Sequence, residues 1–171
     1  AILDNSAVSC WGSGGNGQLG NGVTTDKTTP TLTSSLGTGR TAVAISSGGY
    51  HTCAILDNSA VSCWGSGGNG QLGNGGTSSK NTPTLTNSLG TSRTAVAISS
   101  GWSHTCVILD NGAVSCWGDG SYGQLGSGSG SSSYWRNTPT LTSSLGTGRT
   151  AVAISSGEHH TCAILDNNAV S

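Results

Sequence analysis

One pattern recurs along the 171-residue chain and limits the folds open to it. It consists of a short apolar run, a glycine turn, His-Thr-Cys, a second apolar run, an Asp-Asn turn, and Ala-Val-Ser-Cys-Trp-Gly. Near-copies of it begin at Thr41, Thr94 and Thr150. A fixed period of this length is typical of repeat architectures, in which each unit packs on its neighbours. We therefore predict a repeat protein.

The repeats divide the chain into three units and a partial one. We place them at residues 1–53, 54–106, 107–162 and 163–171. The first two units have 53 residues each and are almost identical, whereas the third has three additional residues within Ser127–Asn137. Residues 163–171 match residues 1–9 except at one position. One hairpin is thus represented at both ends, which is consistent with a mature product, a fragment or an engineered piece.

Each unit is expected to contain four short strands, exemplified by Ala42–Ser46, His51–Leu56, Ala60–Trp64 and Thr82–Thr86. Pro83 marks the last as an edge strand, because proline cannot donate a ladder hydrogen bond. The 29 glycines argue against helices. Four strands in about 50 residues is the size of a propeller blade. We predict an all-β fold of four-stranded antiparallel β-propeller blades, a partial propeller completed by oligomerisation or by a longer parent chain.

The hairpin between the second and third strands predicts a disulfide. If Asp57–Ser59 is a three-residue loop, Leu56 faces Ala60 and Cys53 faces Cys63. The third loop position should then adopt the left-handed conformation. The two cysteines would form a non-hydrogen-bonded pair with Cα atoms about 4.5 Å apart, near the lower limit for a disulfide.

The remaining cysteines occupy equivalent positions. Cys106 and Cys116 should close their own hairpin, and Cys10 should pair with Cys162 across a ring closure or between two chains. Regularly placed cysteines without a CxxC pair favour an oxidising compartment, here extracellular, periplasmic or on the cell surface. The alternative is six buried thiols that act as small hydrophobes.

Composition excludes several classes of partner. The net charge is −1 and only 8% of residues are charged, so we expect no nucleic-acid footprint and no polybasic membrane patch. No apolar stretch approaches the roughly 18 residues of a spanning helix, so we expect no membrane insertion. No signal peptide stands at the first residue, although one could have been removed.

No set of residues predicts catalysis, and we expect no enzymatic activity and no cofactor. Glu158 is the only glutamate, which leaves few paired-carboxylate mechanisms. His51, Cys53 and Cys63 lack the fourth ligand of a structural zinc site, so no metal is expected. We expect His51 and its counterparts to bond to nearby backbone and to shape the glycine turn.

Three segments together resemble the regulator of chromosome condensation repeat family. They are Ile45–Ile55 (ISSGGYHTCAI), Val61–Gly65 (VSCWG) and Gly70–Gly73 (GQLG), and the pattern recurs across the whole chain. The resemblance implies a seven-bladed propeller, a fold used by exchange factors for small GTPases, ubiquitin-ligase modules and protein inhibitors of enzymes. The cysteine pair departs from eukaryotic members and is similar to secreted bacterial or archaeal relatives.

Differences between the near-identical repeats concentrate in two kinds of loop, which leave a four-stranded blade at the same end. The recurring tryptophans Trp11, Trp64 and Trp117 are expected to pack between blades, whereas Trp102 and Trp135 do not recur. We expect a binding face at the variable end, because aromatic residues and arginine are the usual anchors of interfaces. Its candidate residues are Tyr50, Trp102, Ser103, Tyr122, Tyr134, Trp135, Arg136, Glu158 and His159.

Two functions follow from these patterns. The first is a non-enzymatic binding scaffold for a protein or glycan ligand. The second is a structural role, in which chains self-associate head to tail through the split terminal hairpin into a ring or filament. Drift in exposed loops is the competing explanation for the variable face.

Overall fold

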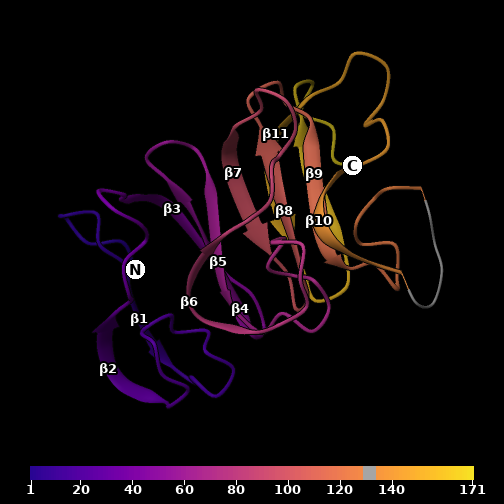
Figure 1. Cartoon of the computed structure of the whole chain (residues 1–171). Coiled ribbons are helices and arrows are strands. Elements are labelled where there is room, and N and C mark those ends of the chain that lie inside the picture. Colours follow the sequence, from indigo (N-terminus) through magenta and orange to yellow (C-terminus); the bar gives the residue numbers. More distant parts are fainter. Residues whose placement is uncertain (129–133) are drawn as a thin grey trace.

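The computed structural model describes residues 1–128 and 134–171, and the strands in this part of the chain form four separate sheets. Neighbouring sheets stand side by side in sequence order (Figure 1). The described residues contain no helix, and hence none long and apolar enough to cross a membrane. The all-β blade architecture predicted from the repeats is confirmed.

Two sheets are complete antiparallel blades in which consecutive strands are neighbours. The first blade consists of β3 (Ala42–Ser47), β4 (His51–Leu56), β5 (Val61–Gly65) and β6 (Lys80–Leu85). The second consists of β7 (Ala95–Ser100), β8 (His104–Leu109), β9 (Val114–Asp119) and β10 (Trp135–Leu141). The strands lie within a few residues of those expected.

The other two sheets are half-blades. β1 (Ser9–Gly12) and β2 (Lys27–Leu32) correspond to the third and fourth strands of a blade. β11 (Ala151–Ser156) and β12 (Thr161–Leu165) correspond to the first and second strands. In Figure 1 the indigo pair β1–β2 and the yellow strands occupy opposite ends of the row of blades. The described arc is therefore an outer half-blade, two whole blades and an inner half-blade.

Register within the hairpins follows the loop as predicted. Cys53 faces Cys63 and Ile55 faces Val61, and the Leu56 amide donates to the Ala60 carbonyl over 2.8 Å. The third loop residue is left-handed in all four copies, with φ of 61° at Ser6 and at Ser59, 75° at Gly112 and 64° at Asn168. Short-range hydrogen bonding alone thus specifies which side chains face each other.

The core lies between blades. One buried cluster joins Ile55 and Leu72 of one blade to Val107, Leu109 and Trp117 of the next. Every residue of β4 and of β8 is buried, because each of these strands is covered on both faces by a neighbouring blade. Burial on both faces explains why these strands are apolar runs without polar alternation.

Trp64 and Trp117 pack between blades as predicted, but the prediction for Trp11 was wrong. Trp64 and Trp117 are 0% exposed, whereas Trp11 is 52% exposed. Trp11 lies on β1, whose half-blade has no inner strands in the described chain. The side chain is exposed because nothing covers the corresponding face.

Candidate binding surface

The turns between first and second strands and the loops between third and fourth strands meet at one end of the blades. The Ser66 amide donates to the Tyr50 carbonyl over 2.8 Å, and the Asp119 amide donates to the Ser103 carbonyl over 2.9 Å. These bonds hold each inner turn against the start of the longer loop of its own blade. The two kinds of variable loop therefore share an end, as strand parity required.

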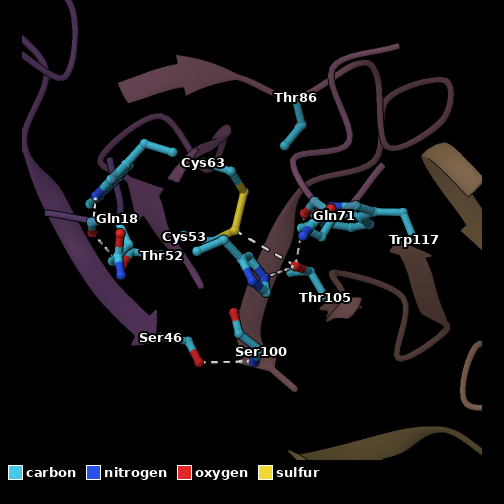
Figure 2. Close-up of a disulfide and its surroundings, with 12 residues drawn as sticks. Gln18, Ser46, Thr52, Cys53, Cys63, Gln71, Thr86, Ser100, Thr105 and Trp117 are labelled. Carbon is cyan, nitrogen blue, oxygen red and sulfur yellow. Dashed lines mark hydrogen bonds between the residues drawn. A yellow bond between two sulfur atoms is a disulfide. The ribbon is translucent and has the colours of Figure 1, made fainter. Parts of the chain in front are cut away.

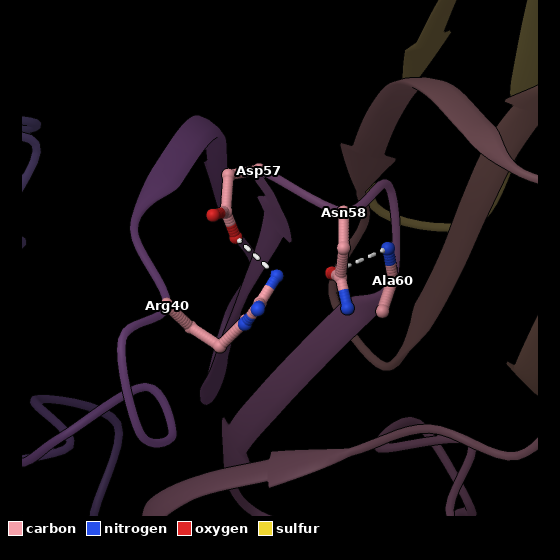
Figure 3. Close-up of polar contacts among 4 residues, drawn as sticks. All are labelled: Arg40, Asp57, Asn58 and Ala60. Carbon is pink, nitrogen blue, oxygen red and sulfur yellow. Dashed lines mark hydrogen bonds and ion pairs between the residues drawn. The ribbon is translucent and has the colours of Figure 1, made fainter.

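The opposite end carries the conserved turns. Arg40 in the linker pairs with Asp57 over 3.2 Å, and the Asn58 side chain accepts a hydrogen bond from the Ala60 amide (Figure 3). The Asp57 amide donates to the Thr41 carbonyl over 2.9 Å. The same ion pair recurs in the other two units. At this end, the ion pair and the backbone hydrogen bond hold the linker against the hairpin of the blade.

Two aromatic residues from successive turns contact each other at the variable end. The Tyr50 and Trp102 rings lie edge to face with centroids 5.1 Å apart, and both side chains are about two-fifths exposed, at 41% and 42%. A side chain at Gly49 would meet the Trp102 ring, because its Cβ would lie 2.7 Å from Cδ2. Glycine at position 49 thus allows the indole to lie across the neighbouring turn.

The contacts continue into the next turn. The Trp102 amide donates to the Glu158 carbonyl over 3.4 Å. Glu158 lies 3.3 Å from the His159 ring nitrogen, and the His159 ring packs on Tyr122 with centroids 4.7 Å apart. We call Tyr50, Trp102, Tyr122, Glu158 and His159 the aromatic arc. It joins three successive blades at their variable end.

The remaining predicted residues form a second group at the outer strand. Arg136 lies over the Tyr134 ring, 4.1 Å from its centroid, a favourable cation–π arrangement. Trp135 begins β10 and is 46% exposed. Ser103 is half-buried beside Trp102. The predicted site is therefore two groups, since nothing in the described contacts joins Trp135 or Arg136 to the arc.

The predicted disulfides in the two whole blades are confirmed. Cys53 bonds to Cys63 and Cys106 bonds to Cys116, each pair with Cα atoms 4.1 Å apart. Neither bond is accompanied by a ligand set for metal, since the described residues hold no group of three or more suitable side chains.

Cys10 and Cys162 form no disulfide within the single chain. They lie on β1 and β12, which belong to the two half-blades at opposite ends of the row. Closure of the chain on itself through these cysteines is therefore not observed. Pairing between two chains stays a prediction.

His51 and His104 each hydrogen-bond to a threonine of the next blade, so the predicted backbone partner was wrong for both. His51 Nε2 lies 2.8 Å from the Thr105 hydroxyl, which lies beside the Cys53–Cys63 disulfide (Figure 2). The ring does shape the glycine turn, because a Cβ at Gly48 would lie 2.4 Å from its Cε1. The sequence separates His51 from Thr105 by a whole repeat, which is why local reasoning missed the contact.

Hydrogen bonding also determines the tautomer of His51. The Thr105 hydroxyl donates to the Gln71 carbonyl over 3.1 Å, so its proton is used and Nε2 of His51 must be the donor. Nδ1 then carries a lone pair, and it has no partner in the described structure. Burial, with a smaller contribution from His104, lowers the pKa of His51 to about 3. His51 is thus a neutral structural residue.

The sequence analysis did not identify a further set of residues, whose hydrogen bonds link each blade to the next. The Gln71 carbonyl accepts hydrogen bonds from both Thr105 and the Trp117 indole of the next blade, and Figure 2 shows these residues together. The Gln18 carbonyl does the same for Thr52 and Trp64. The Gly-Gln-Leu-Gly motif was the available signal, because it recurs between the third and fourth strands of each unit.

Comparison with known proteins identifies these repeats. The Regulator of chromosome condensation (RCC1) repeat matches residues 7–55, 60–108 and 111–164. The chain is 35% identical over 132 residues to the E3 ubiquitin-protein ligase HERC2 of Homo sapiens, covering 75% of this chain and 3% of that protein. It is 33% identical over 128 residues to the Ultraviolet-B receptor UVR8 of Arabidopsis thaliana, covering 75% of this chain and 29% of that protein.

Solved structures share the fold. Human WBSCR16 superposes with a TM-score of 0.83 at 21% identity, over 99% of this chain and 43% of that one. Prp20p from Saccharomyces cerevisiae superposes with a TM-score of 0.79 at 21% identity, over 95% of this chain and 40% of that one. The chain thus spans less than half the length of these relatives. Its blades, its repeat motifs and these matches together show that it belongs to the RCC1 repeat family.

Proposed function

We propose that this chain is a non-enzymatic binding scaffold that contacts a protein ligand through the aromatic arc. The observation that carries the proposal is the coincidence of sequence divergence with exposed, mutually contacting side chains. The residues before each histidine are Gly-Tyr, Trp-Ser and Glu-His in the three copies, whereas the strands on either side are nearly identical. The interblade contacts of these strands explain their constancy.

The chemistry of the arc favours a protein partner. Three aromatic rings, a carboxylate and an imidazole lie within contact distance across three blades. Aromatic side chains offer a large contact area at a low cost in conformational entropy. Each ring is partly supported by a neighbour, so the surface is preorganised before binding. Prp20p, whose fold this chain shares, is described as binding Gsp1p and histones.

The two confirmed disulfides support placement in an oxidising compartment, and we propose that the scaffold acts outside the cytoplasm. Disulfides form and persist on secreted and cell-surface proteins and in the periplasm. The ligand would then be an extracellular or surface protein. A glycan that stacks on Trp102 or Trp135 is the second candidate, favoured by the exposure of both indoles.

The test compares one double variant with a matched control. Tyr50→Ala with Trp102→Ala removes the centre of the arc, and Asp57→Ala alters an equally exposed residue at the opposite end. Immobilised chains are probed with arrays of extracellular proteins and of glycans. Loss of protein retention in the arc variant only would support the proposal. Loss of glycan retention only would favour the second candidate, and unchanged retention in both variants would refute a binding face at this end.

A further inference from the structure

We propose that the aromatic arc recognises a cationic side chain of its protein ligand, a lysine or an arginine, at the Tyr50 and Trp102 rings beside Glu158. Such recognition rests on the binding role proposed above, since it names the chemical group that the same surface takes. The two rings meet at a steep angle, the turns that carry them are acidic, and the chain itself contains a cation–aromatic contact.

The Tyr50 and Trp102 rings form a corner with exposed walls. Their planes meet at 76°, with the ring centroids 5.1 Å apart. In an edge-to-face pair only one ring face is covered by the partner ring, and both side chains are exposed by about two-fifths. The face of an aromatic ring attracts a cation, and alkylammonium groups are held in cages of several such faces. The corner supplies two walls of such a cage.

Backbone hydrogen bonds between successive turns hold this corner in place. The Gly49 amide donates to the Gly101 carbonyl over 3.2 Å, and the Trp102 amide donates to the Glu158 carbonyl over 3.4 Å. The indole lies across Gly49, so its orientation is set by the neighbouring turn. The rings are thus arranged before a ligand arrives, which lowers the entropic cost of binding.

Glu158 supplies a negative charge next to the corner. Gly49, Trp102 and Glu158 occupy the same position, two residues before the histidine, in successive copies. Glu158 therefore follows Trp102 along the row of blades. Its carboxylate lies 3.3 Å from the His159 ring nitrogen, and its side chain is 64% exposed. A carboxylate at this place adds Coulomb attraction to the attraction of the ring faces.

The distribution of charge at the variable end favours a cationic ligand group. Glu158 is the only acidic or basic residue, histidines aside, in the turns at 48–50, 101–103 and 157–160. The nearby Asp119 adds a second carboxylate, which accepts hydrogen bonds from Ser121 and Gln124. Three arginines are paired with aspartates at the opposite end, and the other three cations stand on the outermost strands. They are Arg40, Arg93 and Arg149 in the first group, and Lys27, Lys80 and Arg136 in the second.

The chain already contains a contact of the proposed kind. The Arg136 guanidinium lies over the Tyr134 ring, 4.1 Å from its centroid. Within the described residues no cation lies over Tyr50 or Trp102 in this way. The ring faces at the corner are therefore free to accept a cation that the partner supplies.

A cation suits the corner better than an apolar or an anionic group. An apolar side chain would shield the Glu158 carboxylate from water without giving it a partner, which costs free energy. An anion would be repelled by the carboxylate and by the ring faces. A lysine or an arginine places its charge near the carboxylate and packs its aliphatic stem on the rings.

A small cation tests the chemistry of the corner directly. Tetramethylammonium chloride is titrated into the full chain while the indole N–H resonances are followed by NMR, with tert-butanol as a neutral probe of similar size and sodium chloride as the salt control. The Trp102 resonance should shift with tetramethylammonium only, and the resonance of the buried Trp64 should not move. Similar shifts with tetramethylammonium and tert-butanol, or no shift with tetramethylammonium, would overturn the cation site.

Synthetic peptides of alternating glycine and lysine, or glycine and norleucine, test the same preference in a polypeptide. Fluorescence anisotropy should give a Kd for the lysine peptide roughly 10-fold lower than that for the norleucine peptide. Trp102→Leu should remove this difference, and Trp102→Phe, which keeps a ring, should restore most of it. Equal binding of both peptides, together with protein retention that still requires Tyr50 and Trp102, would refute the cation preference alone and leave the binding role intact.

A charge-matched pair of variants isolates the role of Glu158. Glu158→Gln should weaken binding of the lysine peptide by about 5-fold. Asp110→Asn makes the same change in net charge at the opposite end of the blades and should leave the Kd unchanged. Equal effects of the two substitutions would mean that the peptide responds to net charge only, and would overturn the assigned role of the carboxylate.

Discussion

Acidification should unfold this protein through its buried histidines. His51 and His104 are both 0% exposed. Burial lowers the pKa of His51 to about 3 and that of His104 to about 4, from an ordinary value of 6.5. His104 lies near Asp119, which raises its pKa, and near His159 and His160, which lower it, all by less than burial does. The folded state thus keeps both imidazoles neutral where an unfolded chain would protonate them.

The sign follows from proton linkage. Because the folded pKa values lie below the unfolded one, protonation favours the unfolded chain, so the stabilising contribution is complete above about pH 6.5 and is lost as the pH falls. Between about pH 6 and pH 4.5 the free energy of unfolding should fall by about 1.4 kcal/mol per pH unit for each histidine. Between neutral pH and about pH 4.5, each buried histidine should lower the free energy of unfolding by roughly 2 to 3 kcal/mol in total.

Urea unfolding followed by tryptophan fluorescence, at several pH values, measures this dependence. His51→Gln should lower stability at neutral pH, because the packing on Gly48 changes. It should also reduce the slope of the unfolding free energy against pH by about 1.4 kcal/mol per pH unit, the contribution of one proton. Asn58→Gln, at an exposed position without a titratable group, serves as the control and should leave the slope unchanged. A wild-type slope in His51→Gln would refute the idea that this imidazole is held neutral by burial, since carboxylate titration is common to both proteins.

Three further perturbations test other parts of the structure by the same unfolding assay. Trp64→Ala should cost about 3 to 5 kcal/mol because it empties a packed interblade site, whereas Trp11→Ala should cost far less in the isolated chain; equal costs would contradict the burial pattern. Replacing Cys53 and Cys63 together by alanine opens a loop with a sequence separation of 10, and should cost roughly 2 to 3 kcal/mol; no loss would show that the cross-link does not restrict the unfolded chain. Asp57→Asn breaks an exposed ion pair and should cost less than about 1 kcal/mol, a difference that added salt should erase; a larger loss would mean that the pair organises the linker.

Much of the proposed binding face could be identified from the sequence, although the contacts among its residues could not. The repeat comparison indicated which loops vary and, through strand parity, that they share an end. It could not separate Tyr50 and Trp102, which touch, from Trp135 and Arg136, which lie on an outer strand with no described contact to them. The distances between these side chains depend on the loop conformations and on the packing of one blade on the next. Neither can be recognised from the repeat pattern of the sequence.

The amino-acid sequence by itself determined the hairpins. Loop length and hydrogen-bond alternation sufficed to place Cys53 opposite Cys63 and to require a left-handed third loop residue, because these relations involve neighbours along the chain. The repeat period likewise determined the four-stranded blade. Local rules succeed where the interacting groups are separated by only a few residues.

Burial and interblade bonding were decided only by the tertiary structure. Trp11 and Trp64 have the same local sequence, yet one is half-exposed and the other fully buried; Cys10 and Cys63 are equivalent, yet only Cys63 is bonded. The difference is the presence of the adjoining strands, not the identity of the residue. Identical repeats acquire different environments because a repeat buries its faces against its neighbours, so its position in the row determines what each copy contacts.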